Sequence, residues 1–430
     1  MLKAIKEKMN SGLGQDVIWT FILQIAIMLC SFCINKILAN RLSIDDFGQF
    51  NLIKRSVQVL SFIMLAGVGI ALPRYIPRYK NSTPPQSIIP LLSASLIYII
   101  VVSLVVFFIC ILFSTKVQDI VIGQSENVYL FTVAIAYAFI LALIQYVFAY
   151  YRGTSSFKWY NGSQLAMQIL ITLPLLLIPF LTVNKVFLSW LIITCLLTVF
   201  LFFRETSSYY KQTKHLPFEI HVKKHLVTIA KYSSGRLVGD FFQFSLSAFP
   251  LVYISNVLGL QPTAYFSVGI TLVTMVTPLF SFIGIILLPY VSKAMARNEL
   301  SSANRVVSLL TLFYVVSSLA ITAIIYILIK YLIIIFFAEE YVMTTDTSRI
   351  MVFSILPQAL FLLYRNTIDA VSEIPYNAIF LGICIAAMAI SFSFCTTLTE
   401  FAYAYLAVSI LQGLLSFVTW QILKNRNTTA

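Results

Sequence analysis

Residues 41 to 75, RLSIDDFGQFNLIKRSVQVLSFIMLAGVGIALPRY, decide the fold of this chain, because they align without gaps to residues 257 to 291, VLGLQPTAYFSVGITLVTMVTPLFSFIGIILLPYV. The offset from Leu42 to Leu258 is 216 positions. An apolar segment that occurs twice is typical of membrane transporters built from internal repeats. The same offset aligns five further identical pairs: Phe50/Phe266, Val57/Val273, Ile70/Ile286, Leu72/Leu288 and Pro73/Pro289.

A second set of matched positions supports the repeat. The spacing within this set is nearly the same in both halves of the chain, which indicates duplication rather than chance. The matched residues are Gln145 with Gln358, Arg152 with Arg365, and Tyr160-Asn161 with Tyr376-Asn377.

The composition requires a lipid environment. Hydrophobic residues make up 60% of the chain, charged residues make up 10%, and the mean hydropathy is +0.91, so no stretch supplies the polar exterior of a soluble domain. A helix needs about 20 mainly apolar residues to cross a bilayer. We therefore predict an all-α membrane protein with about twelve transmembrane helices, at residues 17–39, 54–72, 88–113, 128–150, 162–182, 186–203, 235–257, 264–289, 306–329, 346–369, 376–398 and 401–423.

Lysines and arginines predict the orientation of these helices. With a cytoplasmic N-terminus, 21 of the 29 basic residues fall in segments on the cytoplasmic side. Because cytoplasmic loops are enriched in Lys and Arg, both termini are predicted to be cytoplasmic. The net charge of +13 then follows from topology, and the scattering of basic residues over loops argues against a nucleic-acid partner.

The spans divide into two lobes of six helices. We predict an N-terminal lobe at 1–210, a cytoplasmic linker at 211–234 and a C-terminal lobe at 235–430. Because six spans is an even number, both copies insert with the same orientation, and a pseudo-twofold axis along the membrane normal relates them. The linker is interpreted either as an amphipathic helix on the inner leaflet or as an ordinary solvated connection.

Cysteine and histidine do not point to a metal or redox site. All six cysteines fall in predicted spans, where they serve as packing residues, and Cys30-x-x-Cys33 lacks histidine or acidic neighbours. His215, His221 and His225 lie in one predicted loop and are interpreted as solvated residues. We predict no metal and no cofactor.

Polar residues follow one face of the first predicted helix. Gln24, Ser31 and Asn35 are spaced to share that face, and Lys36 adjoins it. In the seventh span, Asp240, Gln243 and Ser247 form a similar stripe, in which Gln24 corresponds to Asp240 and Ser31 to Ser247. We expect both stripes to face a common interior. The alternative is polar packing between helices without a cavity.

Arginines add positive charge to this expected interior. The fourth span carries Gln145 and Arg152, the tenth carries Gln358, Arg365 and Asp369, and Arg74 and Arg78 follow the second span. Guanidinium groups bind phosphate oxygens in pairs and keep their charge when desolvated, so the pattern favours an anionic, phosphate-bearing substrate. In the alternative interpretation, the arginines extend to the membrane interface and Arg365 pairs with Asp369.

Several motifs resemble the Wzx-type polysaccharide flippases of the MOP superfamily, which are related to the MATE exporters. They are Arg41-Leu42-Ser43 with Asp46-Phe47-Gly48-Gln49-Phe50, then Leu72-Pro73-Arg74-Tyr75, and Tyr151-Arg152-Gly153. The resemblance covers essentially the whole chain and implies a MATE-like, two-lobed bundle rather than an enzyme. It also implies alternating access between the leaflets of a bacterial inner membrane, by which undecaprenyl-diphosphate-linked repeat units of O-antigen or a similar glycan cross from the cytoplasmic to the periplasmic side.

The function that the resemblance implies has expected partners, and because the chain has no nucleotide-binding loop, its driving force is expected to come from an ion gradient or from removal of product. The expected partners are the undecaprenyl-diphosphate-linked glycan, membrane lipid, a glycan polymerase and a chain-length regulator. The candidate residues for proton or sodium coupling are Asp240 and Asp369. Two alternatives remain: a MATE-type ion-coupled exporter of small molecules, which would concentrate carboxylates in its interior, and a membrane-embedded glycan polymerase or ligase, which needs a large external loop.

Overall fold

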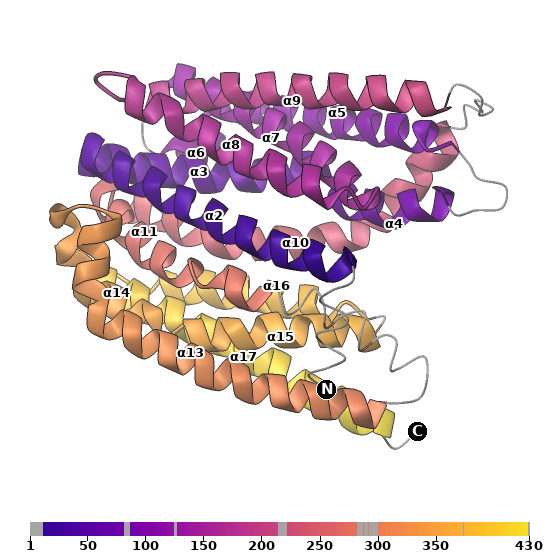
Figure 1. Cartoon of the computed structure of the whole chain (residues 1–430). Helices are drawn as coiled ribbons and strands as arrows, with labels where there is room; N and C mark the ends of the chain where they lie inside the picture. The colour runs from indigo at the N-terminus through magenta and orange to yellow at the C-terminus, as the bar shows by residue number, and fades with distance from the viewer. Residues whose placement is uncertain are drawn as a thin grey trace. The chain divides into compact units, whose positions relative to one another are not determined.

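The structure is a computed structural model that describes residues 12–80, 87–123, 127–213, 222–281, 287, 291, 300–372 and 374–428. Within these ranges all regular structure is helical. Helices are expected here because a bilayer contains no water to bond backbone groups, and a helix satisfies those groups within one segment. Figure 1 follows the helices along the chain by colour.

The contacts of the chain separate into two units. Unit 1 comprises residues 1–42 and 53–237, and unit 2 comprises residues 43–52 and 238–430. Two helices contribute to both units, namely α3 (Ile44–Leu65) and α10 (Val222–Val257). The other helices of unit 1 are α2 (Gly12–Arg41), α4 (Val68–Lys80), α5 (Ile89–Leu112), α6 (Ser114–Ile122), α7 (Val128–Gly153), α8 (Phe157–Leu177) and α9 (Val183–Thr213).

Unit 2 is also built from helices. α15 packs on α17 and α13, while α16 packs on α17. Its elements are α11 (Leu260–Thr274), α13 (Leu300–Phe336), the 3-10 helix η1 (Glu339–Thr344), α14 (Thr345–Val352), α15 (Ile355–Val371), α16 (Tyr376–Phe392) and α17 (Leu398–Thr428).

The predicted membrane spans correspond to observed helices. Within the described ranges, seven helices are long and apolar enough to cross a bilayer, and up to nine if each of two bent pairs forms one span. Two shorter apolar helices, Phe241–Val257 and Tyr376–Phe392, match further predicted spans. Each of the twelve predicted ranges overlaps an observed helix, so the prediction of an all-α membrane protein is confirmed.

Helix boundaries reproduce the sequence repeat. α2 and α10 end at Arg41 and Val257, and α3 and α11 begin at Ile44 and Leu260, so both boundaries differ by the same 216 positions. α9 and α17 begin at Val183 and Leu398, which are 215 positions apart. The duplication therefore extends beyond the residues that are identical in the two halves.

Large apolar side chains cover the outer surfaces of the long helices. Only 22% of the most apolar window of α5 is buried, and the same fraction holds for α13. Leu104 on α5 is 61% exposed and Ile327 on α13 is 71% exposed. In water such surfaces would promote aggregation, whereas lipid tails solvate them. The exposure is therefore evidence for the membrane environment.

The first turns of α3 pack inside unit 2 through Gly48. A β carbon at Gly48 would overlap the carbonyl oxygen of Leu260 and lie 3.1 Å from the amide nitrogen of Ala264. Next to it, the buried ring of Phe47 meets the ring of Tyr341 edge-on, with 5.2 Å between centroids. Only glycine permits this backbone approach. Because Gly48 and Ala264 are 216 positions apart, the duplicated segments meet at equivalent positions.

Replacing Gly48 with alanine should destabilise the protein, because the added methyl group has no space beside the α11 backbone. We expect a loss of about 1–3 kcal/mol, seen as a lower midpoint of thermal unfolding in detergent. Gly162→Ala in α8 is the matched control, since no atom lies within 4 Å of a β carbon there. Equal midpoints for the two variants would contradict the packing argument.

Candidate functional site

Arg152 replaces a helical hydrogen bond that Pro73 cannot make. α3 and α4 are bent by 43° at a break where Ala66 and Gly67 both have positive φ. In the helix that follows, Pro73 has no N–H, so the carbonyl of Gly69 lacks its usual helical donor. The Nη2 atom of Arg152, on α7, donates to that carbonyl oxygen at 2.8 Å. Arg152 therefore stabilises α4 next to the break.

The remainder of the Arg152 side chain is accessible. The residue is exposed, and its guanidinium carbon lies 5.7 Å from the centre of the Tyr160 ring on α8. Gly153 follows directly and allows α7 to approach α4, since a β carbon there would lie 3.0 Å from the carbonyl oxygen of Leu72. A guanidinium carries five N–H donors, so the contact with Gly69 is compatible with a second, ligand-binding role.

The corresponding arginine of unit 2, Arg365, belongs to a different polar cluster. The Nδ2 atom of Asn377 on α16 donates to the carbonyl oxygen of Arg365 at 3.1 Å and to Oδ1 of Asp369 at 2.8 Å. Asn377 is 6% exposed, and its Oδ1 atom is buried without a hydrogen-bond partner in the described structure. Arg152 thus lies against Tyr160 through its side chain, whereas Arg365 is bonded by Asn377 through its backbone.

The polar residues of α2 take part mainly in contacts within the helix bundle. Nε2 of Gln24 donates to Oε1 of Gln164 on α8 at 3.1 Å. Ser31 donates to the carbonyl of Ile27 at 3.1 Å, and its repeat counterpart Ser247 likewise donates to a carbonyl of its own helix. Asn35 is 5% exposed and Lys36 is half-buried. These contacts match the polar packing left open above, and substrate binding by this face stays a prediction.

The three candidate glutamines outside α2 lie in different surroundings. Gln145 on α7 is exposed. Gln358 on α15 donates to the Tyr405 hydroxyl at 3.0 Å and to the Ser409 hydroxyl at 3.3 Å, both on α17. Gln243 on α10 has a buried Oε1 atom with no hydrogen-bond partner among the described residues. Gln243 therefore has an unsatisfied buried acceptor, whereas Gln358 connects two helices.

The remaining candidates are basic or acidic. Arg74 on α4 is exposed, and so is Asp369 on α15. The side chains of Arg78 and Asp240 lie outside the described residues, although both positions are helical. The structure thus brings Arg365, Asp369 and Asn377 together, while the roles of the other candidates stay predictions.

A charged cluster at the ends of α7 and α9 was missed by sequence reasoning. Tyr151, 1% exposed, donates to Oε1 of Glu205 at 3.0 Å, and Arg204 forms an ion pair with the same carboxylate. The Arg204 guanidinium lies over the Trp159 ring, 3.1 Å from its centre. The predicted span ended at residue 203, but α9 continues to Thr213. The available signal was an acidic residue placed directly after an apolar run.

His225 is buried, so its interpretation as a solvated loop residue is wrong. It lies in α10, is 9% exposed, and its Nδ1 atom is 3.0 Å from the Tyr79 hydroxyl of α4. Burial, together with nearby Tyr75, raises the pKa of Tyr79 above its usual value. The helix continues through residues that the sequence assigned to a linker, which explains the burial. His215 and His221 lie outside the described residues.

Comparison with known sequences gives one family. The family described as "Polysaccharide biosynthesis protein" matches residues 13–295, which is more than half of the chain. No curated protein sequence matches the chain significantly.

Several solved structures are similar to the chain over nearly its whole length. An inward-facing multidrug resistance MATE family transporter of the MOP superfamily has a TM-score of 0.73 at 12% identity, covering 95% of this chain and 99% of its own. The Vibrio cholerae MATE transporter VcmN has a TM-score of 0.64 at 12% identity, covering 96% of this chain and 97% of its own. The lipid II flippase MurJ has a TM-score of 0.64 at 14% identity, covering 94% of this chain and 87% of its own. The chain therefore has the MATE-like fold.

The role of Arg152 in replacing a missing donor can be tested by a double-mutant cycle. Arg152→Ala should lower the free energy of unfolding by about 1–3 kcal/mol, because it leaves a buried carbonyl unbonded. In Pro73→Ala the backbone N–H returns and donates to Gly69, so Arg152→Ala should cost about 1 kcal/mol less in that background. The measurement is thermal or denaturant unfolding of the four proteins in detergent.

Pro77→Ala is the matched control for this cycle. It also replaces a proline within α4, but the donor it restores faces the carbonyl of residue 73 rather than that of Gly69. Its effect should add to that of Arg152→Ala. If the Pro73 cycle is as additive as the Pro77 cycle, Arg152 does not replace the missing donor.

Proposed function

We infer that this chain, which belongs to the polysaccharide biosynthesis protein family, is a flippase for undecaprenyl-diphosphate-linked oligosaccharide repeat units of O-antigen or a similar polysaccharide. It is a multi-pass membrane protein with a transporter fold. Family membership points to glycan assembly, and the fold points to movement across a membrane. A lipid-linked glycan intermediate satisfies both.

The observation that carries the proposal is that the matched arginine of each unit contacts the Tyr-Asn pair of the next helix, through its side chain in unit 1 and through its backbone in unit 2. Arg152 lies over the ring of Tyr160, and the backbone of Arg365 is bonded by Asn377. A guanidinium forms paired hydrogen bonds with phosphate oxygens, so an arginine at the matched position of each unit favours a substrate that carries phosphate groups. A neutral or cationic substrate would gain nothing from them.

The proposed transport cycle is alternating access. The arginines, with Arg74 and Arg78, bind the diphosphate while the protein is open to the cytoplasm. Polar side chains such as Gln243 contact the sugars, and the prenyl chain remains in lipid. The protein then opens to the other side of the membrane. Asp369, whose carboxylate accepts a bond from Asn377, and Asp240 are the proposed groups for proton or sodium coupling.

The proposed location is a bacterial inner membrane, with both termini in the cytoplasm. The lipid-linked glycan is made on the cytoplasmic side, and a polymerase and chain-length regulator act on it after transfer. These enzymes are the proposed functional partners, together with the membrane lipids that surround the exposed apolar surfaces of α5 and α13.

One observation favours a second candidate, a MATE-type ion-coupled exporter of small molecules. Asp369 is an exposed carboxylate fixed by a buried asparagine, as a site for a cationic substrate or a coupling ion would require. In that case Asp369→Asn would abolish efflux, and charge reversal at the arginines would have little effect. Because Asp369 is also a proposed coupling group of the flippase, only charge reversal at the arginines separates the two candidates.

Restoration of surface glycan in a flippase-deleted cell tests the proposal. Arg365→Ala should reduce glycan display, because it removes a charge-assisted contact worth about 1.5–3 kcal/mol. Arg365→Lys should retain partial function, and Arg365→Glu should be worst, since it repels phosphate. Arg152 should show the same order once its effect on stability, measured separately, is taken into account.

Arg305→Glu is the matched control for charge reversal. Arg305 is an exposed arginine on α13 that is not among the candidate binding residues. Membrane levels of each variant separate misfolding from lost transport. Full glycan display by the double variant Arg152→Glu/Arg365→Glu, at normal membrane levels, would show that the arginines do not bind the substrate.

A further inference from the structure

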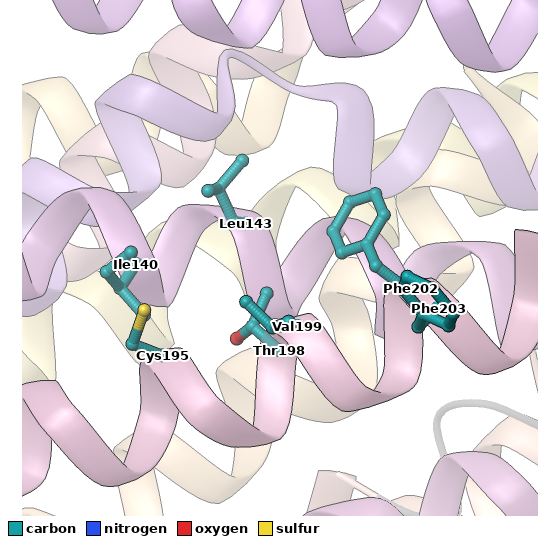
Figure 2. Close-up of a pocket in the computed structure, with 7 residues that line it drawn as sticks. All are labelled: Ile140, Leu143, Cys195, Thr198, Val199, Phe202 and Phe203. Atoms are coloured by element: carbon teal, nitrogen blue, oxygen red, sulfur yellow. The ribbon is translucent and has the colours of Figure 1, made fainter.

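Three apolar depressions that share lining residues follow one another along α7 and α9, and α5 lines the first and the third. Their volumes are about 250, 330 and 410 Å³. Phe202 lines the first and second, while Ile140 and Cys195 line the second and third. Figure 2 shows the middle section, where side chains of α7 and α9 surround the depression. We call this surface the α5/α7/α9 groove.

The groove is longer than one leaflet of a bilayer is deep. On α9 its lining extends from Glu205 to Leu191, which is roughly 21 Å at 1.5 Å per helical residue. On α5 the lining residues occur at the two ends, and Ile89 of the first depression is about 27 Å from Phe107 of the third. The hydrocarbon core of a bilayer is about 30 Å thick, so one leaflet accounts for about 15 Å. An acyl chain of one leaflet fills only part of the groove.

The walls of the groove recognise hydrocarbon by shape. The hydroxyl of Tyr146 donates to the carbonyl of Leu92 at 3.1 Å, and the hydroxyl of Thr198 donates to the carbonyl of Thr194. At the end where α5 begins, Glu205 is paired with Arg204 and bonded by Tyr151, so the mouth carries no net charge. These two hydroxyls and the carboxylate are therefore satisfied within the protein, and most of the other lining residues are apolar.

We propose that the α5/α7/α9 groove holds the polyprenyl chain of the lipid-linked glycan during transport. The proposal rests on the function proposed above and assigns a site to the part of the substrate that remains in the membrane. A polyprenyl chain is longer than one leaflet, which fits the length of the groove. The groove thus keeps the chain beside the protein while the head group crosses.

The covalent link between the polyprenyl chain and its head group explains how a groove that faces lipid can hold this chain. Bilayer tails are as apolar as the groove, so hydrophobicity alone gives a free chain little reason to enter. A chain attached to a bound head group is present at high effective concentration and needs only favourable packing to stay. Bilayer acyl chains, which lack this attachment, exchange freely.

Photolabelling of the full chain in phosphatidylethanolamine/phosphatidylglycerol vesicles tests the proposal. One probe is a polyprenyl monophosphate with a diazirine on its last isoprene unit. The other is a phosphatidic acid with a diazirine at the end of one acyl chain. Labelled peptides are identified by mass spectrometry. We expect the polyprenyl probe to label α7 and α9 peptides of the groove more strongly than the acyl probe does.

Val199→Trp should block the groove, and Val316→Trp is its matched control. Val199 lines the groove and is 58% exposed, while Val316 on α13 is 59% exposed and lies outside it. We expect Val199→Trp to reduce polyprenyl labelling about tenfold, the change for a loss of ~1.4 kcal/mol in binding. Val316→Trp should leave labelling unchanged. The milder Val199→Phe should have an intermediate effect.

Different outcomes separate this proposal from the proposed function. Equal labelling by both probes, or unchanged labelling of Val199→Trp, overturns the groove and leaves an ordinary lipid-facing surface. If the wild-type chain restores surface glycan but the polyprenyl probe labels peptides outside α5, α7 and α9, the groove alone is wrong. If the wild-type chain restores no glycan and the probe labels no peptide, the proposed function fails as well.

Discussion

The absence of water in the bilayer is the constraint on which the rest of this structure depends. A backbone carbonyl that loses its helical donor must find another donor within the protein. Arg152 donates to the carbonyl of Gly69, whose usual helical donor would be the N–H that Pro73 lacks. Arg41 does it at the end of α8, where its guanidinium donates to the carbonyls of Leu175 and Ile178 at 2.5 and 2.9 Å. Breaks and ends of helices are therefore where basic side chains are needed.

This constraint changes the interpretation of the interior cations. An arginine count alone suggests a site for anions, but Arg41 and Arg152 are also structural donors. A guanidinium suits both tasks, because its donors point in several directions and its charge persists in a dry environment. Loss of transport in an arginine variant consequently has two physical causes. A lysine substitution does not separate them, since lysine also donates, so the stability of the variant has to be measured.

The sequence predicted the features that depend on runs and repeats of residues. Continuous apolar runs located the spans, and the ungapped alignment of residues 41–75 with 257–291 anticipated that α3 and α11 begin at equivalent positions. It could not predict which carbonyl a side chain would reach. Arg204, Glu205 and His225 were assigned to solvated segments, because their helices extend beyond the apolar runs. The close approach at Gly48 likewise depends on the path of α11, which no local pattern records.

The two copies of the repeat differ at one position near the matched arginines, where only one copy has a side chain that ionises. The shift that relates Arg152 to Arg365 also relates Ser156 to Asp369. In unit 1 the position holds a hydroxyl that contacts Thr154, and in unit 2 it holds a carboxylate bonded by Asn377. A serine hydroxyl does not ionise near neutral pH, whereas a carboxylate binds a proton or a sodium ion. Within this matched pair of clusters, any coupling to an ion gradient therefore acts through unit 2, while the arginine of unit 1 stabilises a broken helix.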